Sequence, residues 1–152
     1  CDGWLPLYYS PYRQEVYADQ IKDRKPGFEI MQGVSINITD DIEAGLLPVK
    51  QNLAFYVGGM GAQKANFHTE LISRMGLEAE ARKIQELFLA GKRDEAVQVV
   101  PSEFADEISL VGPVERIRDR LKAWEDSPVT SLLVNAPADP AKLRDYAELV
   151  LG

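Results

Sequence analysis

One apolar stretch, Phe28 to Ile38, constrains the fold of this chain more than any other. Apolar side chains recur at every second or fourth position on one parity, and Met31 adds one on the other parity. The first set consists of Phe28, Ile30, Val34, Ile36 and Ile38. A repeat of two residues predicts a β-strand. Apolar side chains on both parities favour a strand that is covered on both faces, as in parallel sheets.

Two further stretches have the character of strands. Trp4 to Tyr9 is apolar and ends at the turn signal Ser10-Pro11, and Val129 to Val134 ends at Asn135-Ala136-Pro137. Residues 12 to 23 lie between the first two strands and are expected to hold one short helix. Strands that alternate with helices predict a parallel α/β sheet or barrel with right-handed crossovers. We therefore predict that the three strands are parallel and adjacent in the sheet.

A long helical region separates the second strand from the third. Thr39-Asp40-Asp41 is a helix start, and the helix is expected from about Asp40 to Val57, kinked or split by Pro48. Gly58, Gly59 and Gly61 then interrupt the apolar run, either as a plain helix C-cap or as a loop that passes close to another group. Further helices are predicted at Ala65 to Met75, Leu77 to Ala90 and Lys92 to Val100, ended by Gly76, Gly91 and Pro101.

The last part of the chain returns to the earlier rhythm. Ile108 to Pro113 introduces a helix whose apolar face holds Val114, Ile117, Leu121 and Trp124. Asp139-Pro140 starts a final helix, and the residues expected to face inward are Leu143, Tyr146, Ala147 and Val150. The helices before this part, at about residues 40–107, are an insertion into the alternating pattern.

Length and charge exclude several classes of protein. The 152 residues fit a single domain, and 17 Lys+Arg against 24 Asp+Glu leave a net charge of −7, which disfavours a nucleic-acid partner. The sequence lacks an apolar run of about 18 residues, so we expect no membrane span. Cys1 is the single cysteine, which fits a reducing cytoplasm. The chain starts without Met on an apolar stretch, and we expect it to be the back part of a longer protein.

Three strands are few for a parallel sheet that needs both faces covered. A complete (β/α)₈ barrel takes about 250 residues. The last three strands of such a barrel, with a large insertion, would account for a chain of this size.

Several short segments together resemble one known family. They are Asp2-Gly3-Trp4-Leu5-Pro6, Ile38-Thr39-Asp40-Asp41, Ala54-Phe-Tyr-Val-Gly-Gly-Met-Gly61, Ser109-Leu-Val-Gly-Pro113 and Ser131-Leu-Leu-Val134. Their order is similar to that in the C-terminal half of luciferase-like monooxygenases, and most similar to the branch that uses the deazaflavin coenzyme F420. The likeness covers nearly the whole chain, and its specificity lies in the combination of segments.

This resemblance implies a fold and a cofactor. The chain would be the C-terminal portion of a (β/α)₈ TIM barrel, with Asp2 to Tyr8, Phe28 to Ile38 and Val129 to Val134 as strands six to eight and a helical insertion before the last strand. The expected activity is hydride transfer between F420 and a small organic substrate. The catalytic residues of the family lie on earlier strands, so we expect them upstream of Cys1 and cannot name them in this chain.

Some pocket residues would nevertheless belong to this chain. The insertion would close over the substrate side of the ring, which makes a set of its residues substrate-pocket candidates: Tyr56, Gly58, Gly59, Met60, Lys64, Asn66 and His68. His68 is the single histidine and could act as a general acid or base, although a lone helical histidine is often structural. Asn135 follows the last strand and is a candidate for cofactor binding. The sequence shows no metal-ligand motif.

Two alternatives remain open at this stage. A flavin mononucleotide (FMN) cofactor would make the protein a luciferase-like monooxygenase that uses oxygen. A non-catalytic α/β assembly domain is the alternative from another class, because the face of Val114, Ile117 and Leu121 could pack against a second chain, including a second copy in a homodimer. The partners expected for the enzyme are a small-molecule substrate and the missing N-terminal half, supplied covalently or as a companion chain.

Overall fold

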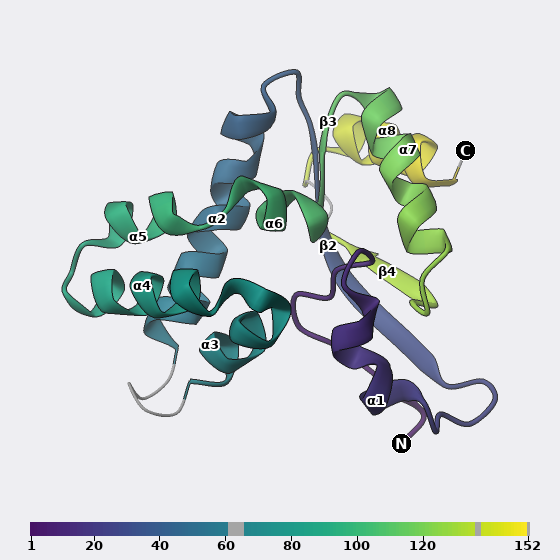
Figure 1. The fold of residues 1–152 in the computed structure, drawn as a ribbon. Helices are drawn as coiled ribbons and strands as arrows, with labels where there is room; N and C mark the ends of the chain where they lie inside the picture. Colours follow the sequence, from purple (N-terminus) through teal and green to yellow (C-terminus); the bar gives the residue numbers. More distant parts are fainter. Residues whose placement is uncertain (61–65, 136–137, 152) are drawn as a thin grey trace. The chain divides into compact units, whose positions relative to one another are not determined.

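The computed structural model describes residues 1–60, 66–135 and 138–151 (Figure 1). Its chain divides into two compact units, one made of Cys1–Gly45 and Asp106–Gly152, the other of Leu46–Ala105. The described strands belong to the first unit, and the second unit is helical. The second unit falls inside the range 40–107 in which the sequence predicts an insertion.

The centre of the first unit is the strand β2, Glu29–Ile38. It pairs in parallel with β1 (Gly3–Trp4), with β4 (Ser131–Val134) and with β3 (Ser109–Gly112). The parallel pairing of the three predicted strands is therefore confirmed, and β3 is an addition.

Backbone hydrogen bonds show on which edge of β2 each partner lies. Glu29 N–H donates to Asp2 O, and Thr39 N–H donates to Gly112 O. On alternate residues, Ile30 O and Val34 O accept from the N–H groups of Thr130 and Asn135. Because alternate backbone groups of a strand point to opposite edges, β1 and β3 lie along one edge of β2 and β4 along the other. The three predicted strands thus follow the order β1, β2, β4.

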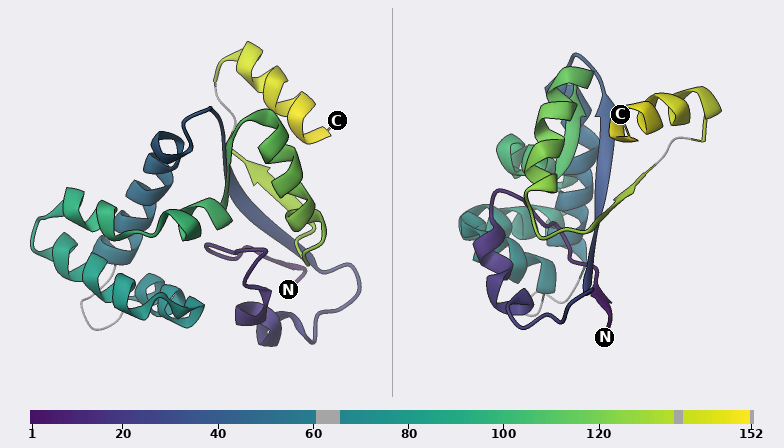
Figure 2. Two further views of the ribbon diagram at one scale, coloured as in Figure 1. Left: turned by 45° about the horizontal axis from the view of Figure 1, so that its top comes forward. Right: turned by 90° about the vertical axis from the view of Figure 1, so that its right-hand side faces the viewer.

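Only one face of β2 is covered. Ile30, Gln32, Val34 and Ile36 are buried, and the residues between them are exposed. The helices α1 (Ala18–Ile21) and α7 (Val114–Glu125) lie on the same side of β2 (Figure 2). The expectation of two covered faces is therefore wrong for the described chain, because Met31 is the one large apolar side chain among the alternate residues Glu29, Met31, Gly33 and Ser35.

The exposed side of the sheet is called the open face below. It consists of Glu29, Met31, Gly33 and Ser35 of β2 together with Leu133 and Asn135 at the end of β4. Leu5, just after β1, borders it, since Leu5 and Met31 line one shallow hollow. The open face lies on the side of β2 away from α1 and α7, and α8 (Pro140–Leu151) lies on this side near the carboxyl end of β2 (Figure 2).

The first strand is shorter than predicted. It ends at Trp4 although the apolar run continues to Tyr9. Pro6 has no N–H to continue the ladder, and Tyr8 takes a φ of 50°, which turns the chain away from the sheet. Tyr9 is instead fully buried and stacks on Tyr17 with 5.1 Å between ring centroids.

The strand β3 was missed by sequence analysis, which took Ile108 to Pro113 as the lead-in to a helix. Two ion-pair groups fix its start. Glu107 accepts hydrogen bonds from the Ser10 hydroxyl (2.9 Å) and from Arg13 Nε (2.7 Å), and Asp106 pairs with Arg116 Nη2 at 2.6 Å. These half-buried contacts hold the four residues of β3 against β2. Because the contacts come from residues outside the strand, the sequence of the four residues alone does not predict it.

The helices of the first unit follow the predicted order with changes at their ends. The predicted helix at residues 12 to 23 is a 3₁₀ turn, Gln14–Tyr17 (η1), continued by α1. The helix α7 buries Ile117 and Trp124 as predicted. The last helix α8, Pro140–Leu151, begins with Asp139 accepting from Ala141 N–H at 2.9 Å.

The inward face of α8 differs from the prediction. Leu149 is buried, whereas Leu143 is 47% exposed and Ala147 is also exposed. The Tyr146 hydroxyl donates to Ile36 O at 3.0 Å, and burial raises the pKa of this phenol. This bond takes the place of the next ladder bond along β2, so α8 is fixed by an edge contact and leaves much of its apolar side unused.

The helix α2, Ile42–Gly59, has 18 residues and lies two residues further along the chain than predicted. It runs through Pro48 without a break, so the predicted split is wrong. The cap is Asp41, whose carboxylate accepts from Ala44 N–H at 3.0 Å, while the Thr39 hydroxyl accepts from Asp41 N–H at 3.1 Å. The predicted glycine break also starts later, because Gly58 and Gly59 are still helical.

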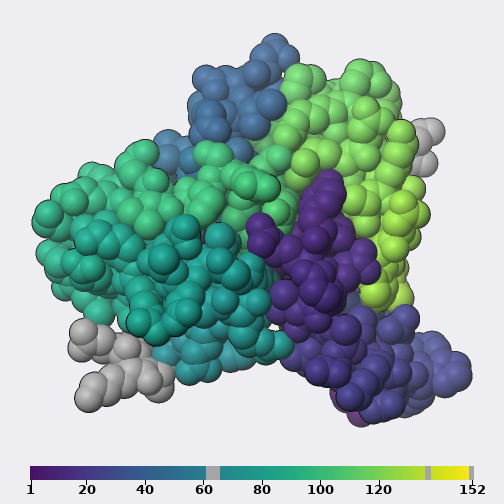
Figure 3. All heavy atoms as spheres, viewed as in Figure 1, coloured from purple at the N-terminus to yellow at the C-terminus, as the bar shows by residue number. Residues whose placement is uncertain are grey.

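The remaining elements of the second unit are α3 (Phe67–Ile72), a π-helical segment η2 (Ser73–Leu77), α4 (Glu78–Leu89), α5 (Arg93–Val99) and α6 (Ser102–Glu107), whose last two residues belong to the first unit. Gly76 and Gly91 stop two of them as predicted, with φ of 85° and 78° that disfavour residues with a Cβ. α3, α4 and α5 form one continuous surface in Figure 3.

Candidate functional site

The corner between α2 and α3 is held by Asn66. Its side-chain amide donates to Val57 O at 2.8 Å, and its carbonyl oxygen accepts from His68 N–H at 2.9 Å and Thr69 N–H at 3.3 Å. Helix ends leave such carbonyls and N–H groups without partners inside the helix. Asn66 satisfies both helix ends with one buried side chain, and it thereby fixes the separation of α2 and α3.

This clamp brings two of the predicted pocket residues together. The rings of Tyr56 on α2 and His68 on α3 meet edge to face, with 5.1 Å between their centroids. Burial lowers the pKa of the His68 imidazole. At neutral pH the imidazole is therefore mainly uncharged and can accept or donate a proton at one nitrogen each.

Gly58 and Gly59 have a packing role. A Cβ on Gly58 would lie 2.4 Å from Phe88 Cβ, and one on Gly59 would lie 2.5 Å from Phe88 Cε1. Real Cβ atoms do not approach this closely, so the two glycines let the end of α2 touch α4 at Phe88. Of the two interpretations of the glycine run, a close approach to another group describes these two residues better than a helix cap.

The other candidates in this segment are Met60 and Lys64. Met60 is 45% exposed directly after α2. Lys64 and Gly61 lie outside the described residues.

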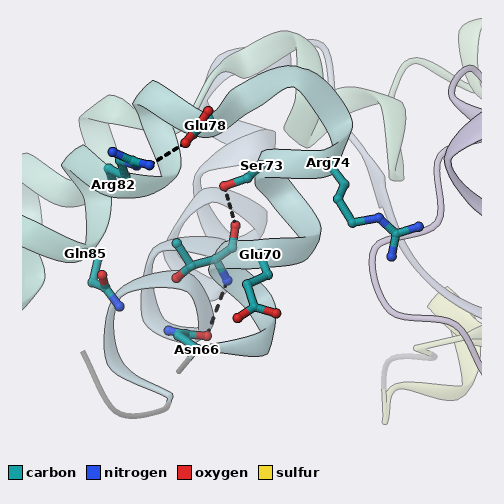
Figure 4. A pocket seen from close by; sticks show the side chains of 8 residues that line it. Asn66, Glu70, Ser73, Arg74, Glu78, Arg82 and Gln85 are labelled. Carbon is teal, nitrogen blue, oxygen red and sulfur yellow. Dashed lines mark hydrogen bonds and ion pairs between the residues drawn. The ribbon is translucent and has the colours of Figure 1, made fainter. Parts of the chain in front are cut away.

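A polar hollow of about 390 Å³ lies beside the corner within the second unit (Figure 4). Asn66 lines it together with Thr69, Glu70, Ser73, Arg74, Glu78, Arg82 and Gln85. Its two carboxylates and two guanidinium groups balance in charge, and Arg82 pairs with Glu78. The Ser73 hydroxyl donates to Thr69 O at 2.8 Å. The charges of the hollow are thus balanced, and they do not create a field of one sign that would favour an ionic ligand.

The second candidate region is the carboxyl end of the open face. Asn135 is exposed, and its N–H donates to Val34 O at 3.5 Å, so the register of β4 on β2 continues to this residue. Since Val34 pairs with Val134, Ser35 and Asn135 are neighbours on the open face. A Cβ built on Gly33, the preceding residue of this face, would meet no atom within 4 Å. Exposed polar groups here stand at the end of parallel strands, where α/β proteins bind ligands.

The first turn of α2 closes the upper end of this face. Asn37 Nδ2 donates to Gly45 O at 3.3 Å, and a Cβ on Gly45 would lie 2.6 Å from Val111 Cγ1. Gly45 therefore allows the helix to rest on Asn37 and Val111. Ser35 is the last residue of β2 on this face that stays exposed.

Comparison with known proteins decides the family. A family model described as luciferase-like monooxygenase matches residues 1–131. The chain belongs to this family.

Relatives within the luciferase-like family are longer than this chain. A protein of Mycobacterium tuberculosis, provisionally named a coenzyme F420-dependent oxidoreductase, is 36% identical over 159 aligned positions, which cover 99% of this chain and 46% of the relative. A coenzyme F420-dependent tetrahydromethanopterin reductase of Methanopyrus kandleri has a similar structure, with a TM-score of 0.63 at 19% identity over 99% of this chain and 43% of the reductase. The chain spans less than half the length of either protein.

The described residues were also searched for metal-binding groups and for membrane-spanning helices. Within residues 1–60, 66–135 and 138–151, no group of three or more His, Cys, Asp or Glu residues could hold a metal ion. Over the same part of the chain, each helix is too short or too polar to cross a membrane.

Ser35 is the residue of the candidate site that sequence reasoning missed. The apolar set of β2 and Asn135 after the next strand have stronger sequence signals than Ser35. The alternate set, Glu29, Gly33 and Ser35, carries the open face. A polar residue two or three positions before the end of a parallel strand, on the parity opposite to the apolar set, is the signal that could have found it.

Proposed function

We propose that this chain is the carboxyl-terminal part of an F420-dependent oxidoreductase of the luciferase-like family. The observation that carries the proposal is the open face: a parallel sheet with one face covered by α1 and α7, and with exposed side chains on the other that are polar at the carboxyl end. Both named relatives bear F420 in their names, and the fold is similar to that of an F420-dependent enzyme.

The residues at the carboxyl end of the open face fit a planar ring. Ser35 and Asn135 offer hydrogen-bond donors and acceptors, and Gly33 leaves the floor beside them flat. Bound F420 supplies hydride transfer, in which two electrons and one proton pass between its deazaflavin ring and an organic substrate. The part of the protein is to orient the ring and keep water away from it.

His68, Tyr56 and Asn66 serve the substrate side in this proposal. The imidazole of His68, with its lowered pKa, can exchange a proton with the substrate at neutral pH. Tyr56 presses against one edge of this imidazole, and Asn66 fixes the backbone N–H beside it. Met60, Gly58, Gly59 and Lys64 remain proposed neighbours of the substrate.

The missing strands are the proposed partner of the open face. All-parallel sheets normally have both faces covered. More than half of each relative lies outside the part that this chain matches. We propose that the corresponding part of the full-length protein closes a barrel over Met31 and Leu133. The same part would also hold the catalytic residues. As the sequence leads us to expect, we place the protein in the cytoplasm.

The test is to identify the cofactor that copurifies with the full-length protein from a host that makes both F420 and FMN. F420 bound in nearly stoichiometric amount supports the proposal. FMN in its place would favour an oxygen-using monooxygenase. A protein that retains neither, and gains neither on incubation, would favour the assembly domain and refute the enzyme assignment.

A further inference from the structure

The helix α2 exposes one side that carries no charge after its first turn. The structure describes the whole of α2, and its exposed positions beyond Glu43 are Ala44, Leu47, Pro48, Gln51, Asn52, Phe55 and Gly59. Their spacing of three or four residues puts them on one side of the helix. Leu47 is 41% exposed and Phe55 is 49% exposed. We call this side the α2 face.

The opposite side of α2 is already buried. Its buried side chains are Leu46, Leu53, Ala54 and Val57. Lys50 is the single charged residue of α2 after Glu43, and its ammonium donates to the Ser102 hydroxyl at 2.6 Å. A helix that is largely apolar all round is typical of the interior of a protein or assembly. The composition of α2 therefore indicates a second covering layer on the α2 face.

Two other helices of the same chain show what a side that faces water is made of. The exposed residues of α7 are all charged: Glu115, Arg118, Asp119, Lys122 and Glu125. Those of α4 are mostly charged: Glu78, Ala79, Arg82, Lys83, Glu86 and Leu89. The α2 face has the composition of an interaction surface instead, since exposed apolar patches commonly mark such surfaces.

The charges at the two ends of the α2 face have opposite signs. Glu43 lies eight residues before Gln51, and Gly59 lies eight residues after it, each about 12 Å away along the helix. Gly59 packs on Phe88, since a Cβ built on it would lie 2.5 Å from Phe88 Cε1. The guanidinium of Arg93 lies over the same Phe88 ring, 5.3 Å from its centroid. A carboxylate therefore stands at the amino end and a guanidinium at the carboxyl end.

This arrangement is complementary to a second copy of itself. A two-fold axis through Gln51, perpendicular to α2, makes two copies of the helix antiparallel. Leu47 and Phe55 are each four residues from Gln51, so Leu47 of one copy meets Phe55 of the other. Glu43 likewise approaches Arg93 of the second copy. The Gln51 amide is both donor and acceptor and can bond to its own copy at the axis, where a charged residue would repel itself.

We propose that the α2 face is an interface between two copies of the full-length protein, with the two-fold axis at Gln51. The inference goes beyond the proposed function, because it involves neither the cofactor nor the substrate. Self-complementarity is the reason for choosing a second copy: the centre of the α2 face is uncharged, and groups of opposite sign lie at equal distances from it.

The test measures the mass of the full-length protein by light scattering over a dilution series. Gln51→Glu places two carboxylates at the axis, and Gln51→Lys places two ammonium groups there. We expect each variant to associate at least about tenfold more weakly than the wild-type protein and to show half its mass. An equal mixture of the two variants should regain the wild-type mass, because opposite charges then meet. Gln98→Glu, at an exposed glutamine of α5, is the matched control and should leave the mass unchanged.

Each other outcome overturns the proposal. A monomeric wild-type protein, or an unchanged mass in both Gln51 variants, shows that copies do not meet at the α2 face. An unchanged mass with a lowered melting temperature shows that another part of the same chain covers it. Loss of mass in both variants without recovery in the mixture shows that α2 meets a different surface, which excludes the two-fold axis. Binding of F420 is a separate measurement, so the proposed function stands or fails independently.

Discussion

At the scale of single residues, Asn66 makes some hydrogen bonds that the sequence predicts and one that it does not. An Asn directly before a helical stretch is a preferred N-cap, so the two bonds to His68 and Thr69 were within reach of sequence reasoning. The bond back to Val57 O was not, because it depends on where α2 ends. The predicted helix break at Gly58 and Gly59 lies further along the chain, since both glycines are still part of α2.

We expect Asn66→Ala to destabilise the full-length protein by about 1–2 kcal/mol. It removes an N-cap and one of the two side-chain hydrogen bonds to Val57 O, the other of which comes from the Thr69 hydroxyl. Urea unfolding measures the change. Asn52→Ala, on the exposed side of α2, is the control and should change stability by less than about 0.5 kcal/mol. Equal effects of the two substitutions would show that the hydrogen bonds of Asn66 between α2 and α3 do not stabilise the protein.

The lowered pKa of His68 predicts a direction of pH dependence. The folded pKa lies below 6.5, the ordinary value for histidine, so the unfolded chain binds the proton more readily. The contribution of neutral His68 to stability is present above pH 6.5 and is lost as the pH falls from there through the lowered pKa of the folded state. We expect the stability of His68→Gln to depend less on pH than that of the wild-type protein between about pH 7.5 and 5.5. An NMR titration with an imidazole midpoint above 6.5 would contradict this sign.

At the scale of elements, sequence periodicity located β2 and the boundaries of most helices, because these depend on local patterns and caps. It failed for β3 and for the length of β1, which are decided by ion pairs from distant residues and by Pro6. It also assigned two covered faces to β2 on the strength of Met31 alone. Burial of a face depends on the layer that lies against it, which the strand itself does not encode.

The contact between α2 and α4 provides a prediction at this scale. Gly58→Ala should destabilise the full-length protein by about 1–3 kcal/mol through overpacking against Phe88. In a Phe88→Ala background the same substitution should be neutral or stabilising by up to about 1 kcal/mol, since alanine favours a helix over glycine. A double-mutant cycle by urea unfolding measures the coupling. Additive effects would mean that the two helices do not meet at this glycine.

At the scale of the whole molecule, the open face predicts that residues 1–152 do not behave as an independent protein. Exposed apolar side chains such as Leu133 and the free edges of parallel strands would promote association. We expect the chain expressed alone to self-associate and to melt without a sharp transition. Leu133→Lys should reduce this association.

The same Leu133→Lys substitution should destabilise the full-length protein, in which we propose that other strands cover Leu133. Light scattering and calorimetry measure the two effects. A monomer of residues 1–152 with a sharp cooperative melt would contradict the proposal that the open face needs a covering layer.

The central claim is that this chain contributes one wall of a deazaflavin site, and the most direct measurement is the stoichiometry of F420 binding by the full-length protein. Quenching of tryptophan fluorescence during parallel titrations with F420 and FMN would follow it, since Trp4 lies on β1 beside β2. We predict equimolar, saturable binding of F420 and much weaker binding of FMN. Saturable binding of FMN alone, or of neither cofactor, would contradict the account.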